Sequence, residues 1–140
     1  MSSFKEYATR IYDNGDKQWF LNDKLHRENG LAAEYSDGYK AWYLNGKPHR
    51  EDGPAVEYAD SGKEWWLYGK RHRADGPAVE HTDGYKAWYL DGEVLTEEEW
   101  KAQVSKPTYS HEGKVVEIDG KRYRLAEVNA HFKLGASRLR

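Results

Sequence analysis

Three histidines recur at a constant interval, and their spacing decides whether they could share a metal ion. His26, His49 and His72 are each 23 residues apart, and each is followed by an arginine. Imidazole is a common zinc ligand, with Zn–N distances near 2.0–2.1 Å. If each period adds two strands to a sheet, equivalent residues lie roughly 9.5 Å apart, at about 4.8 Å per strand. We therefore expect no metal and no cofactor. The imidazoles should instead hydrogen-bond the loop backbone, with Arg50 pairing with Asp52 or an acid of a neighbouring unit.

Glutamates follow the same period and raise the question of acid–base catalysis. Glu57 and Glu80 are 23 residues apart, but a catalytic acid and base need carboxyl groups in unlike environments, and repeated units provide like ones. Cysteine is absent, and the sequence has no Gly-x-Ser-x-Gly elbow, phosphate-binding loop or dinucleotide fingerprint. We expect a protein that is not an enzyme and has no catalytic residues.

Composition and charge exclude several other classes of protein. The mean hydropathy is −1.06, yet the 140 residues include 6 Trp, 11 Tyr and 3 Phe, which is too aromatic for a disordered polar chain. No apolar run approaches the roughly 20 residues that span a bilayer, and residues 1–10 lack the apolar segment of a signal peptide. We therefore expect a cytoplasmic protein that does not bind membranes. Residues 1–100 carry 13 basic and 20 acidic side chains and residues 101–140 carry 9 and 4, which disfavours the first segment as a nucleic-acid surface.

The 23-residue period also predicts the secondary structure of the repeated segment. Trp19, Trp42, Trp65 and Trp88 recur with it, as expected of a repeat array. In the second unit, alternation at 41–44 indicates a strand, Asn45-Gly46 a tight hairpin turn, and Asp52-Gly53 a second break. Whether Lys47 to Asp52 is ladder or loop stays open, since Pro48 disfavours regular pairing. We predict an all-β fold, a single-layer antiparallel β-meander repeat array over residues 1–95. Its strands are expected at 7–12, as a leading half repeat, then 17–22 with 30–35, 40–45 with 53–58, 63–68 with 76–81, and 86–90.

The period stops after Leu95. Thr96 and Glu99 form a capping box, which predicts a capping helix over 96–105, with Trp100 and Val104 against the end of the sheet. Residues 106–113, with Pro107, are the expected linker. Residues 114–140 should form a β-hairpin around Asp119-Gly120 and a basic tail.

The repeated unit resembles the MORN repeat, on Gly38, Trp42, Gly46, His49 and Gly53 in that order. It departs from that pattern in having three residues between the tryptophan and the turn glycine, and His-Arg-Glu-Asp-Gly-Pro in place of His-Gly-x-Gly. It is closer to MORN-like variants with His-Arg-x-Asp-Gly-Pro-Ala in small phage and bacterial proteins. The resemblance covers about residues 13–95. It implies a scaffold, a dimerisation module or a binding surface, and a host cytoplasmic location if the protein is phage-encoded.

Alternation predicts two unlike faces, of which one carries the tryptophans, stacked as near neighbours, and forms the principal core. This core face is expected to hold Trp19, Leu21, Trp42, Leu44, Val56, Trp65, Leu67, Val79, Trp88 and Leu90. The opposite face should carry an aromatic strip flanked by carboxylates, which we predict as the partner-binding site because aromatic side chains combine large contact area with few rotors. Its members are Phe20, Tyr43, Trp66, Tyr89, Glu34, Glu57 and Glu80. The alternative is that these rings only cover backbone and pack on one another.

The basic C-terminal residues provide a second candidate surface. We regard four arginines as candidate anion contacts, namely Arg122, Arg124, Arg138 and Arg140. The alternative is that they pair with the acidic array or stay solvated. We predict a non-enzymatic protein–protein binding module, which the phage likeness would make an inhibitor or decoy acting on a host defence protein. A nucleic-acid-binding protein using residues 114–140 and a scaffold are the alternatives. A homodimer through the sheet edges, at Tyr7 to Tyr12 or in the C-terminal hairpin, is also compatible with the sequence.

Overall fold

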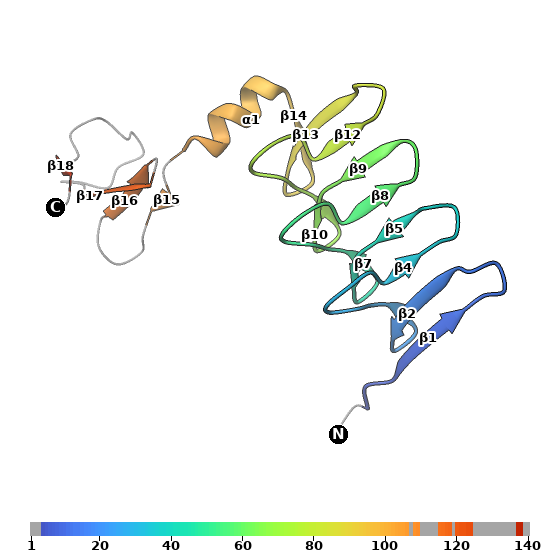
Figure 1. The fold of residues 1–140 in the computed structure, drawn as a ribbon. Coiled ribbons are helices and arrows are strands. Elements are labelled where there is room, and N and C mark those ends of the chain that lie inside the picture. Colours follow the sequence, from blue (N-terminus) through green and yellow to red (C-terminus); the bar gives the residue numbers. More distant parts are fainter. Residues whose placement is uncertain (1–3, 107, 110–114, 119, 125–136, 139–140) are drawn as a thin grey trace. The chain divides into compact units, whose positions relative to one another are not determined.

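A long antiparallel sheet runs through the N-terminal of two compact parts of the chain. The computed structural model describes residues 4–106, 108–109, 115–118, 120–124 and 137–138, and the chain divides into an N-terminal part, Met1–Val104, and a C-terminal part, Ser105–Arg140. In the N-terminal part the strands follow one another in chain order (Figure 1), which confirms the predicted all-β meander. The strands are β1 (Tyr7–Ile11), β2 (Lys17–Leu21), β4 (Ala33–Glu34), β5 (Lys40–Ala41), β8 (Val56–Tyr58), β9 (Gly62–Glu64), β12 (Val79–His81), β13 (Lys86–Leu90) and β14 (Glu93–Leu95).

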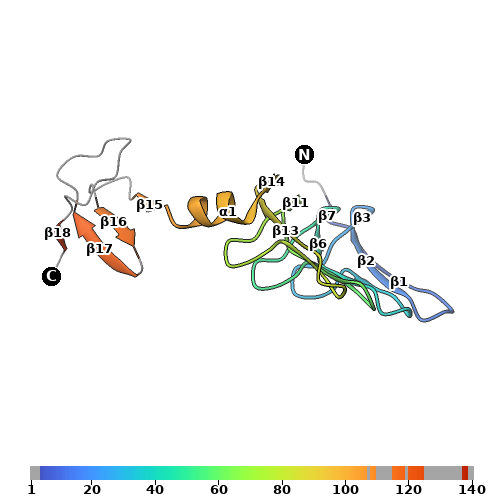
Figure 2. The same cartoon turned by 90° about the horizontal axis from the view of Figure 1, so that it is seen from above.

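Short hairpins branch from this sheet, so the predicted strand 40–45 is divided. Trp42 donates its N–H to Ala55 of the long sheet, but its carbonyl accepts from His49 of the branch. The Asn45-Gly46 turn has φ angles of 50° and 78°, as a type I′ hairpin requires. The branches gather along one side of the sheet (Figure 2). They are β3 (Lys24–Leu25) on β2, β6 (Tyr43–Leu44) with β7 (Lys47–Pro48), and β10 (Trp66–Leu67) with β11 (Lys70–Arg71).

Backbone hydrogen bonds join each short hairpin to the next. Gly46 N–H donates to the Leu25 carbonyl over 2.8 Å, and Arg27 N–H donates to the Tyr43 carbonyl over 3.0 Å. The same two bonds recur 23 and 46 residues later. They join Gly69 to Pro48, Arg50 to Trp66, Gly92 to Arg71, and Arg73 to Tyr89. Pro48 therefore pairs through its carbonyl, and its missing N–H is not needed.

Register assigns the two faces of the sheet, because residues opposite one another on neighbouring strands share a face. Ala41 lies opposite Ala33 and Val56, and these three form a buried cluster against Tyr43 and other aromatic residues. The prediction that Val56 and Val79 belong to the tryptophan face is therefore wrong, because both lie on the opposite face, where Val56 is part of the buried cluster. The strand pattern fixes alternation within a strand, but only register, set by the connecting loops, relates one strand to the next.

Lysine and glutamate alternate across the strands on the other face. Lys40 lies opposite Glu34 and Glu57, and Lys63 lies opposite Glu57 and Glu80. Lys63 Nζ is 3.6 Å from a carboxylate oxygen of Glu57. These glutamates are thus flanked by cations of neighbouring strands and lie on the face opposite Tyr43, which corrects the prediction that they border the aromatic strip.

The helix α1 (Glu97–Val104) ends the N-terminal part of the chain. Both bonds of the predicted capping box are present, from Thr96 N–H to the Glu99 carboxylate (2.9 Å) and from Glu99 N–H to the Thr96 hydroxyl (3.2 Å). Trp100 is buried, and its indole N–H donates to the Arg73 carbonyl over 2.8 Å. The helix contacts β13 and β14, so the expected closure of this end of the sheet is confirmed for Trp100, whereas Val104 is only half-buried.

The C-terminal part of the chain contains a small antiparallel sheet. It is formed by β15 (Thr108–Tyr109), β16 (Val115–Ile118), β17 (Lys121–Arg124) and β18 (Ser137–Arg138), in that order. The predicted hairpin is therefore present between β16 and β17, with Gly120 at φ 72°. Part of the expected linker is a strand, since β15 lies within residues 106–113.

Candidate functional site

One face of the sheet, which we call the tryptophan face, carries Trp19, Trp42, Trp65 and Trp88, and arginines stack on the first three of these rings. The Arg50 guanidinium carbon is 4.3 Å from the Trp42 ring centroid, and Arg73 is 3.8 Å from Trp65. Gly53 provides the room, because a Cβ there would be 3.0 Å from the Arg50 guanidinium. Cation–π stacking of this kind contributes about 0.5–2 kcal/mol per pair. Arginines thus cover the rings, where we expected neighbouring tryptophans to stack on one another.

The same arginines tie the loops together. Arg50 Nε is 2.9 Å from Asp52, and its Nη1 donates to the Pro54 carbonyl over 3.2 Å, which confirms the expected pairing. Arg73 repeats both bonds and also contacts Glu80 at 3.0 Å. One guanidinium therefore contacts both Trp65 and Glu80, which independently places this glutamate on the tryptophan face.

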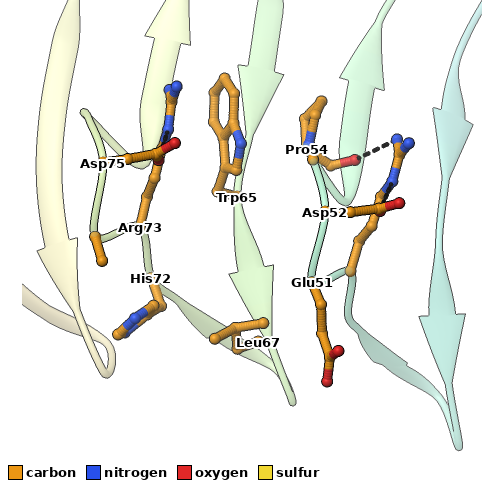
Figure 3. Close-up of a pocket in the computed structure, with 11 residues that line it drawn as sticks. Glu51, Asp52, Pro54, Trp65, Leu67, His72, Arg73 and Asp75 are labelled. Carbon is orange, nitrogen blue, oxygen red and sulfur yellow. Dashed lines mark hydrogen bonds and ion pairs between the residues drawn. The ribbon is translucent and has the colours of Figure 1, made fainter. Parts of the chain in front are cut away.

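Grooves separate successive loops on the tryptophan face. Trp65 lies between Pro54 of one loop and Arg73 of the next (Figure 3), and Leu67 also lines this groove, which has a volume of about 580 Å³. A second groove of about 560 Å³ is lined by Trp42 and Leu44 in the same way. Because these grooves repeat with the period, they are explained by the stacking of units.

The histidines connect one unit to the next. Asn45 N–H donates to His26 Nδ1 over 2.9 Å, and Tyr68 N–H donates to His49 Nδ1 over 3.0 Å. The corresponding bond to His72 comes from Asp91. Each imidazole accepts the first N–H of the following unit's tight turn, which confirms the expected structural role. No group of three metal-binding side chains occurs among the residues that the structure describes.

The opposite face, which we call the tyrosine face, is broader than the predicted aromatic strip. Tyr39 has ring contacts with Tyr35 at 5.1 Å and Tyr58 at 5.6 Å between centroids. Tyr35 and Tyr39 pack against the buried cluster, as do Tyr43 and Trp66. Burial, with a hydrogen bond to Tyr43, raises the pKa of Tyr39. Sequence reasoning placed Tyr35 and Tyr58 at the ends of predicted strands and Tyr39 just before one, and it included none of the three in the aromatic strip.

An ion pair between a buried glutamate and a partly exposed arginine interrupts this face. Glu64 is only 6% exposed and lies opposite Val56 and Val79 in the row of small apolar residues. Its carboxylate accepts the Trp66 indole N–H at 2.8 Å and lies 3.3 Å from Arg71 Nη2. Burial acts to lower the pKa of Arg71, but the hydrogen bond and charge of Glu64 outweigh burial and raise it.

The paired guanidinium is held beside two aromatic rings. The Arg71 guanidinium carbon is 4.9 Å from the Trp66 ring centroid and 5.4 Å from that of Tyr89. About a third of the Arg71 side chain is exposed, at 36%. The result is an oriented, partly exposed arginine between large rings, the combination that recurs at binding hot spots.

Comparison of the 23-residue repeat units shows where one unit differs from the others. On the tryptophan face the second repeat unit, which contains Trp42, and the third, which contains Trp65, agree, since tryptophan, leucine, histidine and arginine recur unchanged. On the tyrosine face the third unit differs. Gly62, Glu64, Trp66 and Arg71 stand where the second unit has Tyr39, Ala41, Tyr43 and Pro48. A backbone that needs only alanine and proline there does not require an ion pair, so stacking does not explain it. This difference between units was the sequence signal available for Glu64 and Arg71.

The predicted site residues are thus only partly brought together. Trp66 and Tyr89 meet through Arg71, and Tyr43 packs on the same cluster as Trp66, whereas Phe20 lies under the Arg10 guanidinium at 4.4 Å. The glutamates occupy the other face, as described above. Of the predicted anion contacts, Arg122 and Arg124 lie in β17 and Arg138 in β18, opposite Tyr123, while Arg140 is outside the described residues.

Among the described residues no helix is long and apolar enough to cross a bilayer. The likeness to MORN variants is not tested by any relative, so it stays a prediction from the repeated residues. Comparisons of the chain with protein-family models, curated proteins and solved structures give no match.

Proposed function

We propose that this protein is a binding module that holds another protein against its tyrosine face, with Arg71, Trp66 and Tyr89 at the centre of the contact. The observation that carries the proposal is the ion pair of Glu64 and Arg71 in a single unit. Replacing buried ion pairs by apolar residues is often neutral or stabilising, and the second unit has such residues there. The pair is therefore better explained by recognition than by stability.

The surroundings suit a protein partner. Hot spots of protein interfaces are enriched in Trp, Tyr and Arg, and oriented side chains lose little entropy on binding. The guanidinium of Arg71, whose side chain is partly exposed, has five N–H donors and can donate to a carboxylate or a backbone carbonyl of the partner. The likeness to phage proteins favours a host protein as that partner, with inhibition or decoy of a defence system as the action.

The test compares two matched variants of the full chain. Glu64→Ala with Arg71→Pro introduces the residues of the second repeat unit at these two positions of the tyrosine face, and Glu34→Gln with Glu57→Gln and Glu80→Gln neutralises the three predicted glutamates on the tryptophan face. Each immobilised variant is incubated with host-cell lysate, and retained proteins are quantified by mass spectrometry. We expect a partner retained by wild type and by the glutamine variant, and reduced at least about tenfold with the double variant, an effect of roughly 1.4 kcal/mol.

Two outcomes would reject the proposal. A partner retained equally by wild type and the double variant would exclude the Arg71 site, and loss with the glutamine variant alone would move the site to the tryptophan face. Titration with generic duplex DNA and RNA tests the nucleic-acid alternative, since binding through the basic C-terminal unit would fall steeply with salt. We expect no such binding.

A further inference from the structure

The first strand leaves one edge of the long sheet open. All five residues of β1 are exposed, including Ile11 at 69%, and the apolar side chain of Phe4, which precedes the strand, is 89% exposed. At the opposite end, α1 packs Trp100 against the last strands. Natural edge strands are usually blunted by proline, bulges or several lysines. None of these devices occurs within β1, whose Arg10 is directed to Phe20 and Asp23.

Hydrogen bonding to β2 shows which backbone groups face this edge. Asn22 N–H donates to the Glu6 carbonyl and Tyr12 N–H donates to the Asp16 carbonyl. In an antiparallel pair the backbone groups of successive residues alternate between the two sides of the strand. Even-numbered residues of β1 therefore bond to β2. Tyr7, Thr9 and Ile11 direct their N–H and C=O groups outward, where no strand of the described chain pairs with them.

This edge is complementary to itself. If two copies meet antiparallel about a two-fold axis at Thr9, Tyr7 of each copy lies opposite Ile11 of the other. All six outward groups of each strand are then paired, and an aromatic ring faces a branched aliphatic chain, a favourable cross-strand pair. The same register places Lys5 opposite Asp13 at both ends, and Arg10 faces Ala8, so no like charges oppose one another.

We propose that two copies of the chain join through β1 in this register, extending the long sheet across a two-fold axis. The interface does not use Arg71 or its neighbours, so it is independent of the proposed partner site. It leaves the tyrosine faces of both copies on the same side of the joined sheet, because rotation about an axis normal to a sheet preserves its faces. The dimer would therefore present two partner sites on one side of the joined sheet, separated by the strands from β1 to β9 of both copies.

Single cysteines test the register, because the chain has none of its own. In the proposed dimer the two Thr9 Cα atoms are about 5.5 Å apart, as in a hydrogen-bonded antiparallel pair, within the roughly 4.4–6.8 Å that a disulfide requires. The two Tyr7 Cα atoms are offset by four residues, roughly 14 Å at about 3.4 Å per residue. Under a mild copper oxidant we expect Thr9→Cys to form a disulfide-linked dimer and Tyr7→Cys to stay unlinked, as read on a non-reducing gel.

Thr9→Pro tests the pairing itself. It removes an outward N–H without removing a bond to β2, and proline is tolerated on edge strands. Sedimentation over a range of concentrations should show a monomer–dimer equilibrium for wild type and Thr9→Val, and a monomer for Thr9→Pro with an unchanged circular dichroism spectrum. If Thr9→Pro fails to fold, the cysteine pair still decides. A wild type that is monomeric at all concentrations, or equal crosslinking at both cysteines, would overturn the proposal.

Discussion

Breaking the ion pair one residue at a time should reveal the cost of burying Glu64. Arg71→Pro removes the guanidinium but leaves a carboxylate that is 6% exposed, with the Trp66 indole N–H at 2.8 Å as its remaining donor. Removing one partner of a fully buried pair costs about 3–5 kcal/mol. Because Arg71 is 36% exposed, water can reach part of the space that it leaves. We therefore expect a loss of about 2–3 kcal/mol in the free energy of unfolding.

The other two variants complete the cycle. Glu64→Ala leaves an arginine that can turn to solvent, so we expect a loss below about 1 kcal/mol. The double variant Glu64→Ala with Arg71→Pro has the residues of Ala41 and Pro48 in the preceding unit, and we expect it within about 1 kcal/mol of wild type. The two losses are then far from additive, as expected of residues in contact.

Urea denaturation followed by tryptophan fluorescence measures all four proteins. Equal m-values are required before the free energies are compared, because a changed m-value signals a changed denatured or native state. A double variant as unstable as Arg71→Pro would refute the reasoning, since the loss would then come from proline in β11 and not from an unpaired carboxylate. A Glu64→Ala variant as unstable as Arg71→Pro would likewise contradict it.

Three further predictions concern the fold. His49→Ala should lose about 2 kcal/mol of stability, from a hydrogen bond to Tyr68 N–H and a ring contact at 4.0 Å. His49→Asn, whose side-chain oxygen replaces Nδ1, should lose less than His49→Gln in the same denaturation assay, and equal losses would reject the turn-cap role. Above about pH 10 the free energy of unfolding should fall with pH, because the pKa of Tyr39 is raised on folding and the folded state holds its proton longer; a Tyr39→Phe variant with the same alkaline slope in a pH series of melts would contradict this. Trp100→Ala should lower the stability of the N-terminal part of the chain by about 3 kcal/mol, because burial and the bond to Arg73 are lost. An unchanged thermal melting temperature would show that α1 does not cap the sheet.

Features that depend on local residue chemistry could be predicted from the sequence. The turn at Asn45-Gly46 needs residues that tolerate positive φ, and the helix start at Thr96 needs a capping box, so both are encoded within a few residues. The period predicted the meander, and the predicted hydrogen bonding of the histidines to loop backbone is confirmed by the N–H bonds that the imidazoles accept from the next unit's turn.

Features that depend on how strands pair could not be predicted. Alternation places Tyr43 and Trp42 on opposite faces of one strand, but only the pairing of Ala41 with Val56 decides which residues of the next strand join them. A shift of one residue in register exchanges the faces, and this is why Glu57 and Glu80 were assigned beside the aromatic strip and lie instead among lysines. The meeting of Glu64 and Arg71 likewise depends on the short hairpin folding back, which brings residues seven apart in sequence into contact on the tyrosine face.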